Sequence, residues 1–285
     1  MNEEIKRKSI LVTGCSSGIG LCVAQGLHAR GYRVFATARK AEDVARLESM
    51  GLEALALDLD DSNSINSAVD EVLRRSGGSL DALFNNGAYG QPGAVEDLSR
   101  EVLRAQLETN LLGTVELTNR IIPVMREQGH GRIIQNSSVL GLIVLPYRGA
   151  YSASKYALEA LSQALRLELR GSGVHISLIE PGPVTSAFRK NAFAKYRENI
   201  DKGNSYHREI YEGMERRLTK QGPAQPFTLP PEAVLTKVIH ALESHRPQAH
   251  YYVTFPTYLF AFLRRILTAR GLDWVLRQVS RNENK

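Results

Sequence analysis

The chain has 285 residues, 43% of them hydrophobic and 23% charged, a globular composition that excludes fully disordered, collagen-like and disulfide-stapled chains. Its net charge of +6 does not predict nucleic-acid binding, because no block of five or more basic residues occurs. Two cysteines, Cys15 and Cys22, are too few for a disulfide framework and are typical of a reducing compartment.

The first nine residues, MNEEIKRKS, are charged and lead directly into a short apolar run at 10–12. They lack the apolar region and the small-residue cleavage site of a signal peptide. No run of about 18 uninterrupted apolar residues follows, so we expect no membrane-spanning helix. The sequence therefore predicts a cytoplasmic protein.

Short apolar runs rich in β-branched residues alternate with helical patterns from residue 9 to about residue 180. The runs are apolar on both faces, as strands buried between two helical layers are. The predicted strands are residues 9–13, 32–37, 53–58, 81–85, 132–137 and 175–180, with a short one near 250–254. This alternation predicts an α/β fold, in which a single Rossmann-type, doubly wound parallel sheet carries helices on both faces.

Two segments interrupt this pattern. Residues 186–230 are polar, contain several glycines and prolines, and are long for a connection, which predicts a partly helical lid; disorder is the alternative. Residues 255–279 mix aromatic residues and leucines with arginines, so we expect an amphipathic helix pair that packs on the lid or on a partner subunit. Peripheral membrane contact is the alternative for this C-terminal segment. Because no linker or repeat separates these parts, residues 1–285 are predicted to form one domain.

The first predicted strand runs into a glycine-rich turn that opens a helix. Glycines there let the backbone approach a ligand, and a helix N-terminus attracts a pyrophosphate. A glycine triplet alone is weak support, but the first βα turn is where α/β sheets bind dinucleotides. The predicted nucleotide-binding residues of this turn are Gly14, Ser16, Ser17, Gly18, Ile19 and Gly20.

The end of the second strand distinguishes NAD from NADP. An acidic residue there accepts hydrogen bonds from the ribose 2′-OH and repels a 2′-phosphate. In this chain Thr37 stands where the acid is expected, and Arg39 and Lys40 follow before the first carboxylate, Glu42. The planar guanidinium of Arg39 suits a phosphate, so NADP is the predicted cofactor and NAD is less favoured. A solvated surface pair is the alternative for Arg39 and Lys40.

Ser138, Tyr151 and Lys155 form the strongest chemical signal in the chain. Tyr151 and Lys155 are four residues apart and share one helical face, while Ser138 follows the fifth predicted strand. Carbonyl reduction needs a hydride at carbon and a proton at oxygen. A Tyr hydroxyl with a pKa lowered by a nearby ammonium can transfer that proton, and a Ser hydroxyl can hold the substrate oxygen. We expect no metal site.

The glycine spacing T-G-x-x-x-G-x-G at 13–20, together with Y-x-x-x-K at 151–155, resembles the short-chain dehydrogenase/reductase family. The resemblance implies roles for further residues. Asn110 resembles the family's helix Asn, which is linked to the Lys through water in a proton relay. Asp58, with Leu59 beside it, stands where the family places an Asp on the adenine amino group. The P-G-x-V-x-T segment that holds the nicotinamide carboxamide is matched by Pro181, Gly182, Val184 and Ser186.

One motif departs from the family. After the fourth strand the family reads N-N-A-G, whereas this chain reads Asn85-Asn86-Gly87-Ala88, of which Asn85, Asn86 and Gly87 are expected to line the cofactor. The exchanged glycine and alanine leave open the conformation of this loop and the affinity for the cofactor. The other motifs look most like the hydroxysteroid and retinol dehydrogenase branch and its bacterial relatives.

The resemblance implies an NADP(H)-dependent oxidoreductase that interconverts a carbonyl and an alcohol. The apolar run at 142–146 favours a lipophilic substrate, such as a retinoid, a steroid or a medium- to long-chain aldehyde. A non-catalytic nucleotide-binding sensor or scaffold is the alternative. The helix that begins near Tyr151 is more apolar than one buried stripe requires, and the family pairs this helix across a two-fold axis, so we expect a homodimer or homotetramer.

Overall fold

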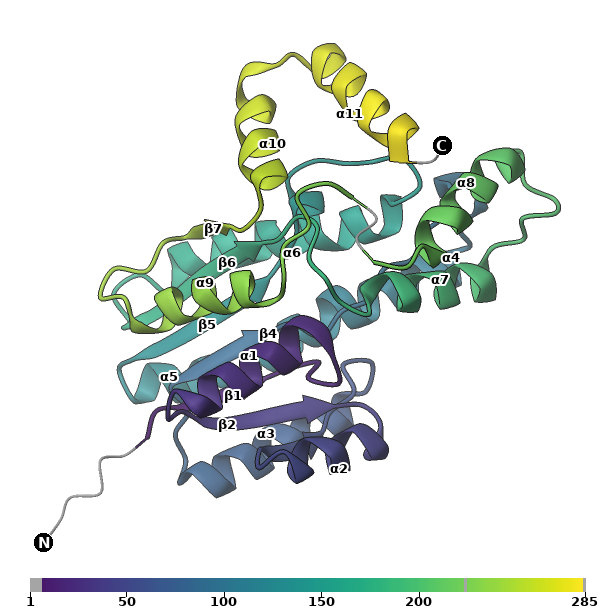
Figure 1. Cartoon of the computed structure of the whole chain (residues 1–285). Helices are drawn as coiled ribbons and strands as arrows, with labels where there is room; N and C mark the ends of the chain where they lie inside the picture. The colour runs from purple at the N-terminus through teal and green to yellow at the C-terminus, as the bar shows by residue number, and fades with distance from the viewer. Residues whose placement is uncertain (1–6, 223–224, 284–285) are drawn as a thin grey trace, which may run out of the picture.

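The computed structural model describes residues 7–222 and 225–283 (Figure 1). Most of the N-terminal segment on which the signal-peptide prediction rests lies outside these ranges, as do residues 223–224 of the segment 186–230. Within the described ranges, no helix combines the length and the apolarity needed to cross a bilayer. Cys15 and Cys22 are both free thiols.

Seven strands form one parallel sheet, which confirms the predicted fold class. Their order across the sheet is β3-β2-β1-β4-β5-β6-β7, so the chain reverses its direction of winding between β1 and β4. In such sheets, ligands bind beyond the carboxyl ends of the strands at this reversal. The strands are β1 (Ser9–Val12), β2 (Arg33–Ala38), β3 (Glu53–Ala56), β4 (Ala82–Asn85), β5 (Gly131–Asn136), β6 (Val174–Glu180) and β7 (His250–Tyr252).

Helices cover both faces of the sheet. They are α1 (Gly18–Ala29), α2 (Ala41–Ser49), α3 (Ser62–Ser76), α4 (Arg100–Leu107), α5 (Gly113–Glu127), α6 (Gly149–Glu168) and α9 (Glu232–Glu243). Successive strand side chains point to opposite faces, which gives each face its own core. Ile10 and Val12 pack with α1, α2 and α9, whereas Leu11 and Phe35 pack with α3 and α5. The strands are apolar on both faces for this reason.

Two helix pairs extend beyond this frame (Figure 1). The segment 186–230 holds α7 (Phe188–Asn199) and α8 (Arg208–Thr219), whose own core includes the fully buried Tyr211. The C-terminal pair is α10 (Phe255–Ile266) and α11 (Ala269–Glu283). α10 packs on the short 3-10 helix Val139–Gly141, and α11 contacts α8.

Candidate active site

The glycine-rich turn after β1 is shaped by backbone contacts that only glycine permits. Gly14 and Gly18 adopt φ angles of +69° and +58°, and a Cβ on Gly14 would lie 2.9 Å from the Cα of Gly87. A Cβ on Gly20 would lie 2.2 Å from the carbonyl oxygen of Gly14. Ser17 is the N-cap of α1 and makes no side-chain capping bond, so the helix N-terminus stays available to an anion. This cradle fits a pyrophosphate.

The loop after β4, in which Gly87 and Ala88 are exchanged relative to the family motif, is stabilised by hydrogen bonds to Thr13. The hydroxyl of Thr13 accepts hydrogen bonds from the backbone N–H groups of Asn86 and Gly87, both at 2.8 Å. Gly87 sits so close to Leu59 that a Cβ would lie 2.9 Å from its Cδ1. Ala88 is not among the non-glycine residues with positive φ, which in the described part of the chain are Tyr147 and Phe227. The exchange therefore leaves the loop in an ordinary conformation.

The residues beyond β2 and β3 are those predicted to form the adenosine end of the cofactor site. Thr37 is buried and donates its hydroxyl hydrogen to the carbonyl of Val12 at 3.2 Å, so it cannot stand in for a ribose-binding acid. Arg39 is exposed at the end of β2, and the described residues supply no ion-pair partner for it. Lys40 instead pairs with Glu42 at 3.3 Å.

Two neighbouring contacts complete this end of the site. Asp61, not Asp58, caps α3 by accepting a hydrogen bond from the N–H of Asn63 at 2.9 Å. Asp58 accepts the N–H of Asp60 at 3.2 Å, and the adenine role that the family motif implies for it stays a prediction. The guanidinium of Arg46 donates to the carbonyl of Ser16 in the glycine turn, a contact that the sequence pattern does not predict.

The three predicted catalytic side chains come together at the carboxyl edge of the sheet. The Ser138 hydroxyl accepts the N–H of Leu140 at 3.1 Å, which leaves its own hydrogen free to be donated. It also hydrogen-bonds the Tyr151 hydroxyl, which favours the tyrosinate form. The Lys155 ammonium lies 5.7 Å from the centroid of the Tyr151 ring and donates to the Asn136 carbonyl at 2.7 Å.

The expected direction of the Tyr151 pKa is wrong in this structure. Burial raises the pKa of Tyr151 to about 12, against the smaller lowering by Ser138. The pKa of Lys155 is itself lowered by burial, to about 8, because desolvation penalises its charge. Tyr151 is therefore protonated at neutral pH, which is the form that gives a proton to a carbonyl oxygen.

A chain of hydrogen bonds links Lys155 to the glycine turn. Asn136, whose carbonyl holds Lys155, donates its side-chain amide to the Oδ1 of Asn86 at 2.9 Å. Asn86 in turn donates to the carbonyls of Thr13 and Gly14 at 3.0 and 3.2 Å. These hydrogen bonds connect the ends of β5, β4 and β1, and so link the position of the Lys155 ammonium to that of the glycine turn.

Asn110 lies in a π-helical turn, Glu108–Leu112, between α4 and α5. Its side-chain amide donates to the Tyr89 carbonyl at 2.8 Å and to the Ser154 hydroxyl at 3.2 Å, and its oxygen accepts the Tyr89 N–H at 3.1 Å. Asn110 thus connects the segment after β4 to α6. Such π-helical turns are frequent at functional sites. Because both amide donors are used here, the implied water link from Asn110 to Lys155 stays a prediction.

The predicted carboxamide segment lies against the glycine turn. A Cβ on Gly18 would lie 2.9 Å from the Cβ of Ser186, and a Cβ on Gly182 would lie 2.1 Å from the Thr254 hydroxyl. Val184 forms an isolated parallel bridge with Leu229, which anchors the segment. Pro181 accepts the N–H of Val139 at 2.8 Å and so connects it to the segment that carries Ser138.

A buried acidic cluster lies one helical turn beyond Lys155. Glu159 is 4% exposed and its pKa is raised to about 7, mainly by burial. Glu180 accepts a hydrogen bond from His250 at 2.6 Å. The donor atoms of Glu159, Glu180 and His250 all lie within 4.8 Å of one another, so these are the described residues that could hold a metal ion. The sequence analysis does not single out Glu159, although its position four residues after Lys155 puts both side chains on one face of α6.

Apolar side chains pack against Tyr151. Tyr151 packs against a cluster contributed by the segment after β5 and by α10 and α11. The buried members are Leu140, Ile143, Leu145, Phe260 and Leu276. The ring of Phe188, from α7, meets the Tyr151 ring edge-on at a centroid distance of 5.2 Å.

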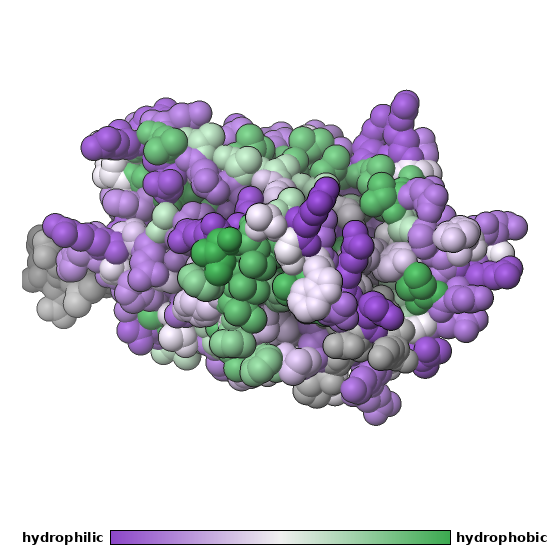
Figure 2. All heavy atoms as spheres, turned by 90° about the horizontal axis from the view of Figure 1, so that it is seen from above, coloured by the Kyte–Doolittle hydropathy of each residue, from purple (hydrophilic) through white to green (hydrophobic). Residues whose placement is uncertain are grey.

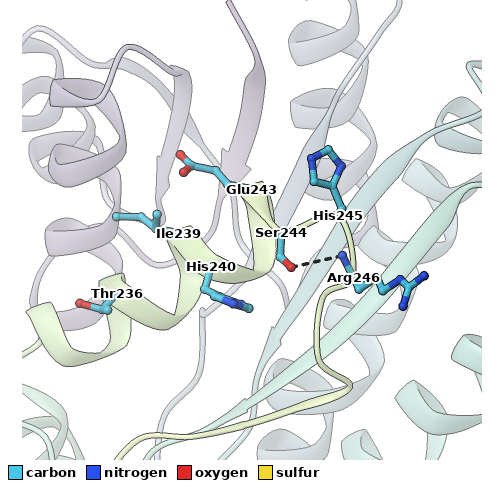
Figure 3. A pocket seen from close by; sticks show the side chains of 7 residues that line it. All are labelled: Thr236, Ile239, His240, Glu243, Ser244, His245 and Arg246. Atoms are coloured by element: carbon cyan, nitrogen blue, oxygen red, sulfur yellow. Dashed lines mark hydrogen bonds between the residues drawn. The ribbon is translucent and has the colours of Figure 1, made fainter.

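A separate hollow of about 630 Å³ lies at the end of α9, lined by residues within 236–246 (Figure 3). It is at the amino edge of the sheet, because β7 begins just after this turn and all strands are parallel. Arg30 pairs with Glu243 at its rim at 2.6 Å. Tyr151 and the glycine turn lie at the opposite edge, so this hollow is not part of the candidate active site.

Residues 8–197 match the family model for short chain dehydrogenases. The chain belongs to the short-chain dehydrogenase family. It is 42% identical over 273 residues to the uncharacterized oxidoreductase YbbO of Escherichia coli K12, covering 96% of this chain and 95% of the relative. It is 34% identical over 263 residues to human 17-beta-hydroxysteroid dehydrogenase type 1, covering 87% and 78%.

A crystal structure of a short-chain dehydrogenase from Streptomyces avermitilis superposes with a TM-score of 0.75 at 28% identity, over 97% of this chain and 98% of that one. The fold and the family thus agree. This short-chain dehydrogenase is an oxidoreductase that acts on CH–OH donors and has the fold that binds NAD(P).

Proposed function

We propose that the chain is an NADPH-dependent reductase of lipophilic aldehydes or ketones, with Ser138, Tyr151, Lys155 and Asn110 as its catalytic set. The observation that carries the proposal is Tyr151, which is half-buried, packs against a cluster of apolar side chains and is hydrogen-bonded to Ser138. A protonated phenol in a low-polarity surrounding is suited to protonating a carbonyl oxygen.

When bound, NADPH supplies the hydride, and the protein orients the carbonyl and supplies the proton. Ser138 donates a hydrogen bond to the carbonyl oxygen, which can only accept one, while its own oxygen accepts the Leu140 N–H. Tyr151 gives its proton to that oxygen as charge develops. The Lys155 ammonium, fixed by the Asn136 carbonyl, stabilises the resulting tyrosinate.

The preference for NADPH rests on Arg39. Its guanidinium is exposed at the end of β2, and the first two carboxylates after it in the sequence, Glu42 and Asp43, are paired with Lys40 and Arg46. A second guanidinium, that of Arg46, lies on the backbone of Ser16 at the same end of the site. Charge-assisted hydrogen bonds from arginine to phosphate are among the stronger ones in proteins.

The preference for a lipophilic substrate rests on the apolar surroundings of Tyr151. Leu140, Ile143 and Leu145 lie on one side of it and Phe188 meets its ring, so a small polar substrate would leave apolar surface unfilled. The relationship to a dehydrogenase named for hydroxysteroids points the same way.

The test is a turnover screen. Purified protein with NADPH or NADH would be offered a series of straight-chain aldehydes of increasing length, a retinoid aldehyde and a ketosteroid, and consumption of the nicotinamide cofactor would be followed by absorbance. We expect kcat/KM to rise with apolar surface and to be higher with NADPH. NADPH binding without turnover of any carbonyl would favour the alternative, a non-catalytic nucleotide sensor.

A further inference from the structure

Helix α10 is apolar on two opposite faces. One face carries Thr257, Phe260 and Ala261, which are buried against the rest of the molecule. The other face carries residues at helical spacing that remain exposed: Phe255 at 57%, Tyr258 at 51%, Leu259 at 37%, Phe262 at 59% and Ile266 at 59%. A helix that packed only on its own protein would carry polar residues on this second face.

The exposed apolar surface continues beyond α10. The ring of Phe227, which is 59% exposed, lies 5.1 Å from the ring of Phe255. Phe227 has a φ of +60°, a conformation that costs energy for a residue with a side chain, and it is maintained with the ring facing outward. On α11, Trp274 is 65% exposed. We refer to Phe227 and the five exposed residues of α10 as the apolar patch: Phe227, Phe255, Tyr258, Leu259, Phe262 and Ile266.

The two C-terminal helices are also rich in positive charge, although Arg264 lies over the ring of Tyr156 at 5.4 Å. The two C-terminal helices carry exposed arginines at 264, 265, 270, 277 and 281, against a single exposed acid in residues 255–281, Asp273. Seen from above, green apolar atoms gather over α10 with purple polar side chains beside them (Figure 2). Large exposed apolar patches rimmed by polar residues mark interaction surfaces.

We propose that the apolar patch docks the protein on the surface of an anionic lipid bilayer, with its rings and aliphatic side chains among the headgroups and its arginines on the lipid phosphates. Aromatic and aliphatic residues on one helix face, beside arginines, have the chemistry of an interfacial helix. A second copy of this chain fits less well, because pairing two apolar patches would bring two sets of arginines together.

The position of the patch connects it to the candidate active site. Phe260, on the opposite face of α10, is in the same buried cluster as Leu140 and Tyr151. A bilayer on the outer face of α10 would therefore hold a lipophilic substrate one helix away from Tyr151. This last step rests on the proposed function, whereas docking itself does not.

Trp274 is the sole tryptophan of the chain, so its fluorescence reports on docking directly. The full chain would be mixed with phosphatidylcholine vesicles or with vesicles containing phosphatidylglycerol. We expect cosedimentation and a blue shift of the emission with the anionic vesicles, weakened by salt. The double variant Phe262→Ser/Ile266→Ser should lose about tenfold or more in vesicle affinity. The variant Arg265→Glu/Arg270→Glu should lose the preference for anionic vesicles.

The matched control is Met50→Ser, which also changes an exposed apolar residue but lies at the end of α2, far from α10 (Figure 1). It should bind vesicles as the wild type does. Circular dichroism would establish that each variant is folded. A wild-type chain that ignores anionic vesicles, or a double variant that binds them unchanged, overturns the proposal. A halved mass of the double variant in light scattering would assign the patch to a second copy instead. Vesicle binding by Tyr151→Phe separates docking from any failure of the proposed activity.

Discussion

The ring of Phe188 covers the ring of Tyr151 edge-on, with 5.2 Å between their centroids. Phe188 opens α7, is itself 36% exposed, and reaches back toward Gly90, where a Cβ would lie 2.7 Å from its Cζ. The first residue of α7, in the segment proposed as a lid, therefore contacts the proposed proton donor. A bulky substrate that reached Tyr151 would contact Phe188 as well.

We expect Phe188→Ala to raise the KM for long-chain aldehydes roughly 5- to 20-fold, because part of the apolar burial of the substrate is lost. The KM for a short aldehyde and the Kd for NADPH should change little. Steady-state kinetics over the aldehyde series measure this. Tyr206→Ala, which removes a 92% exposed ring from the same segment, is the matched control. Equal KM changes for short and long aldehydes would contradict a role in substrate binding.

Tyr151→Phe should reduce turnover by about 10²- to 10⁴-fold while leaving NADPH binding intact, because it deletes the proton donor and nothing in the glycine turn. Single-turnover kinetics and fluorescence titration with NADPH measure the two effects. Tyr156→Phe is the control, since its hydroxyl donates to the Leu142 carbonyl at 2.7 Å and its loss should cost about 1 kcal/mol of stability without abolishing turnover. Activity above a tenth of wild type would exclude Tyr151 as the acid.

Local spacing explains which parts of the site could be predicted from the sequence. Tyr151 and Lys155 share a face because both lie on one helix, and the glycine turn follows one strand directly. The link from Lys155 through Asn136 to Asn86 joins neighbouring strands β4 and β5, so it depends on their register. The pKa of Tyr151 depends on burial by segments distant in sequence, and for that reason its direction was mispredicted.

The cofactor preference depends on Arg39. Arg39→Ala should weaken NADPH binding about 10- to 150-fold, the effect of losing a charge-assisted contact of roughly 1.5–3 kcal/mol, and should leave NADH nearly unaffected. Kd values from fluorescence titration with both cofactors measure this. Arg74→Ala, which removes an arginine paired with Glu71 on α3, controls for net charge. Equal weakening of NADPH and NADH would show that Arg39 does not contact the 2′-phosphate.

Glu159 should act on the reaction through Lys155. Burial lowers the pKa of Lys155 to about 8, even though the negative charge of Glu159 opposes this shift. Glu159→Gln removes that charge, so Lys155 loses its proton at lower pH and the alkaline fall in kcat moves to lower pH. The same variant should lose part of the pH dependence of stability. The folded-state pKa of Glu159 is raised to about 7, so the native chain binds more protons than the unfolded one up to that pH.

Stability contributed by protonated Glu159 is therefore present below its unfolded pKa of about 4.5 and is lost as pH rises to about 7. Urea unfolding at several pH values should show this decline in the wild type and a flatter profile in Glu159→Gln. Glu180, His250 and Lys155 also act on the Glu159 carboxyl group. Burial lowers the pKa of Lys155 to about 8, so the free energy of unfolding should rise above about pH 8 as this buried ammonium loses its charge. A kcat profile that keeps its alkaline limb in the variant would mean that Glu159 does not act on Lys155.

The last prediction concerns α6, whose outer face carries an apolar stripe that this chain alone does not cover. Its members recur at helical spacing and include small residues that let two helices approach closely: Ala153, Ala160, Leu161, Ala164 and Leu167. We predict that α6 pairs with α6 of a second copy in a homodimer, or a homotetramer built on it. Light scattering at micromolar concentration should give a multiple of 31.6 kDa, and Leu161→Glu/Leu167→Glu should lower it to 31.6 kDa. The variant Phe262→Ser/Ile266→Ser, on the separate apolar patch, should leave the mass unchanged. A wild-type mass of 31.6 kDa would refute the pairing, because it would show that the protein is a monomer at this concentration.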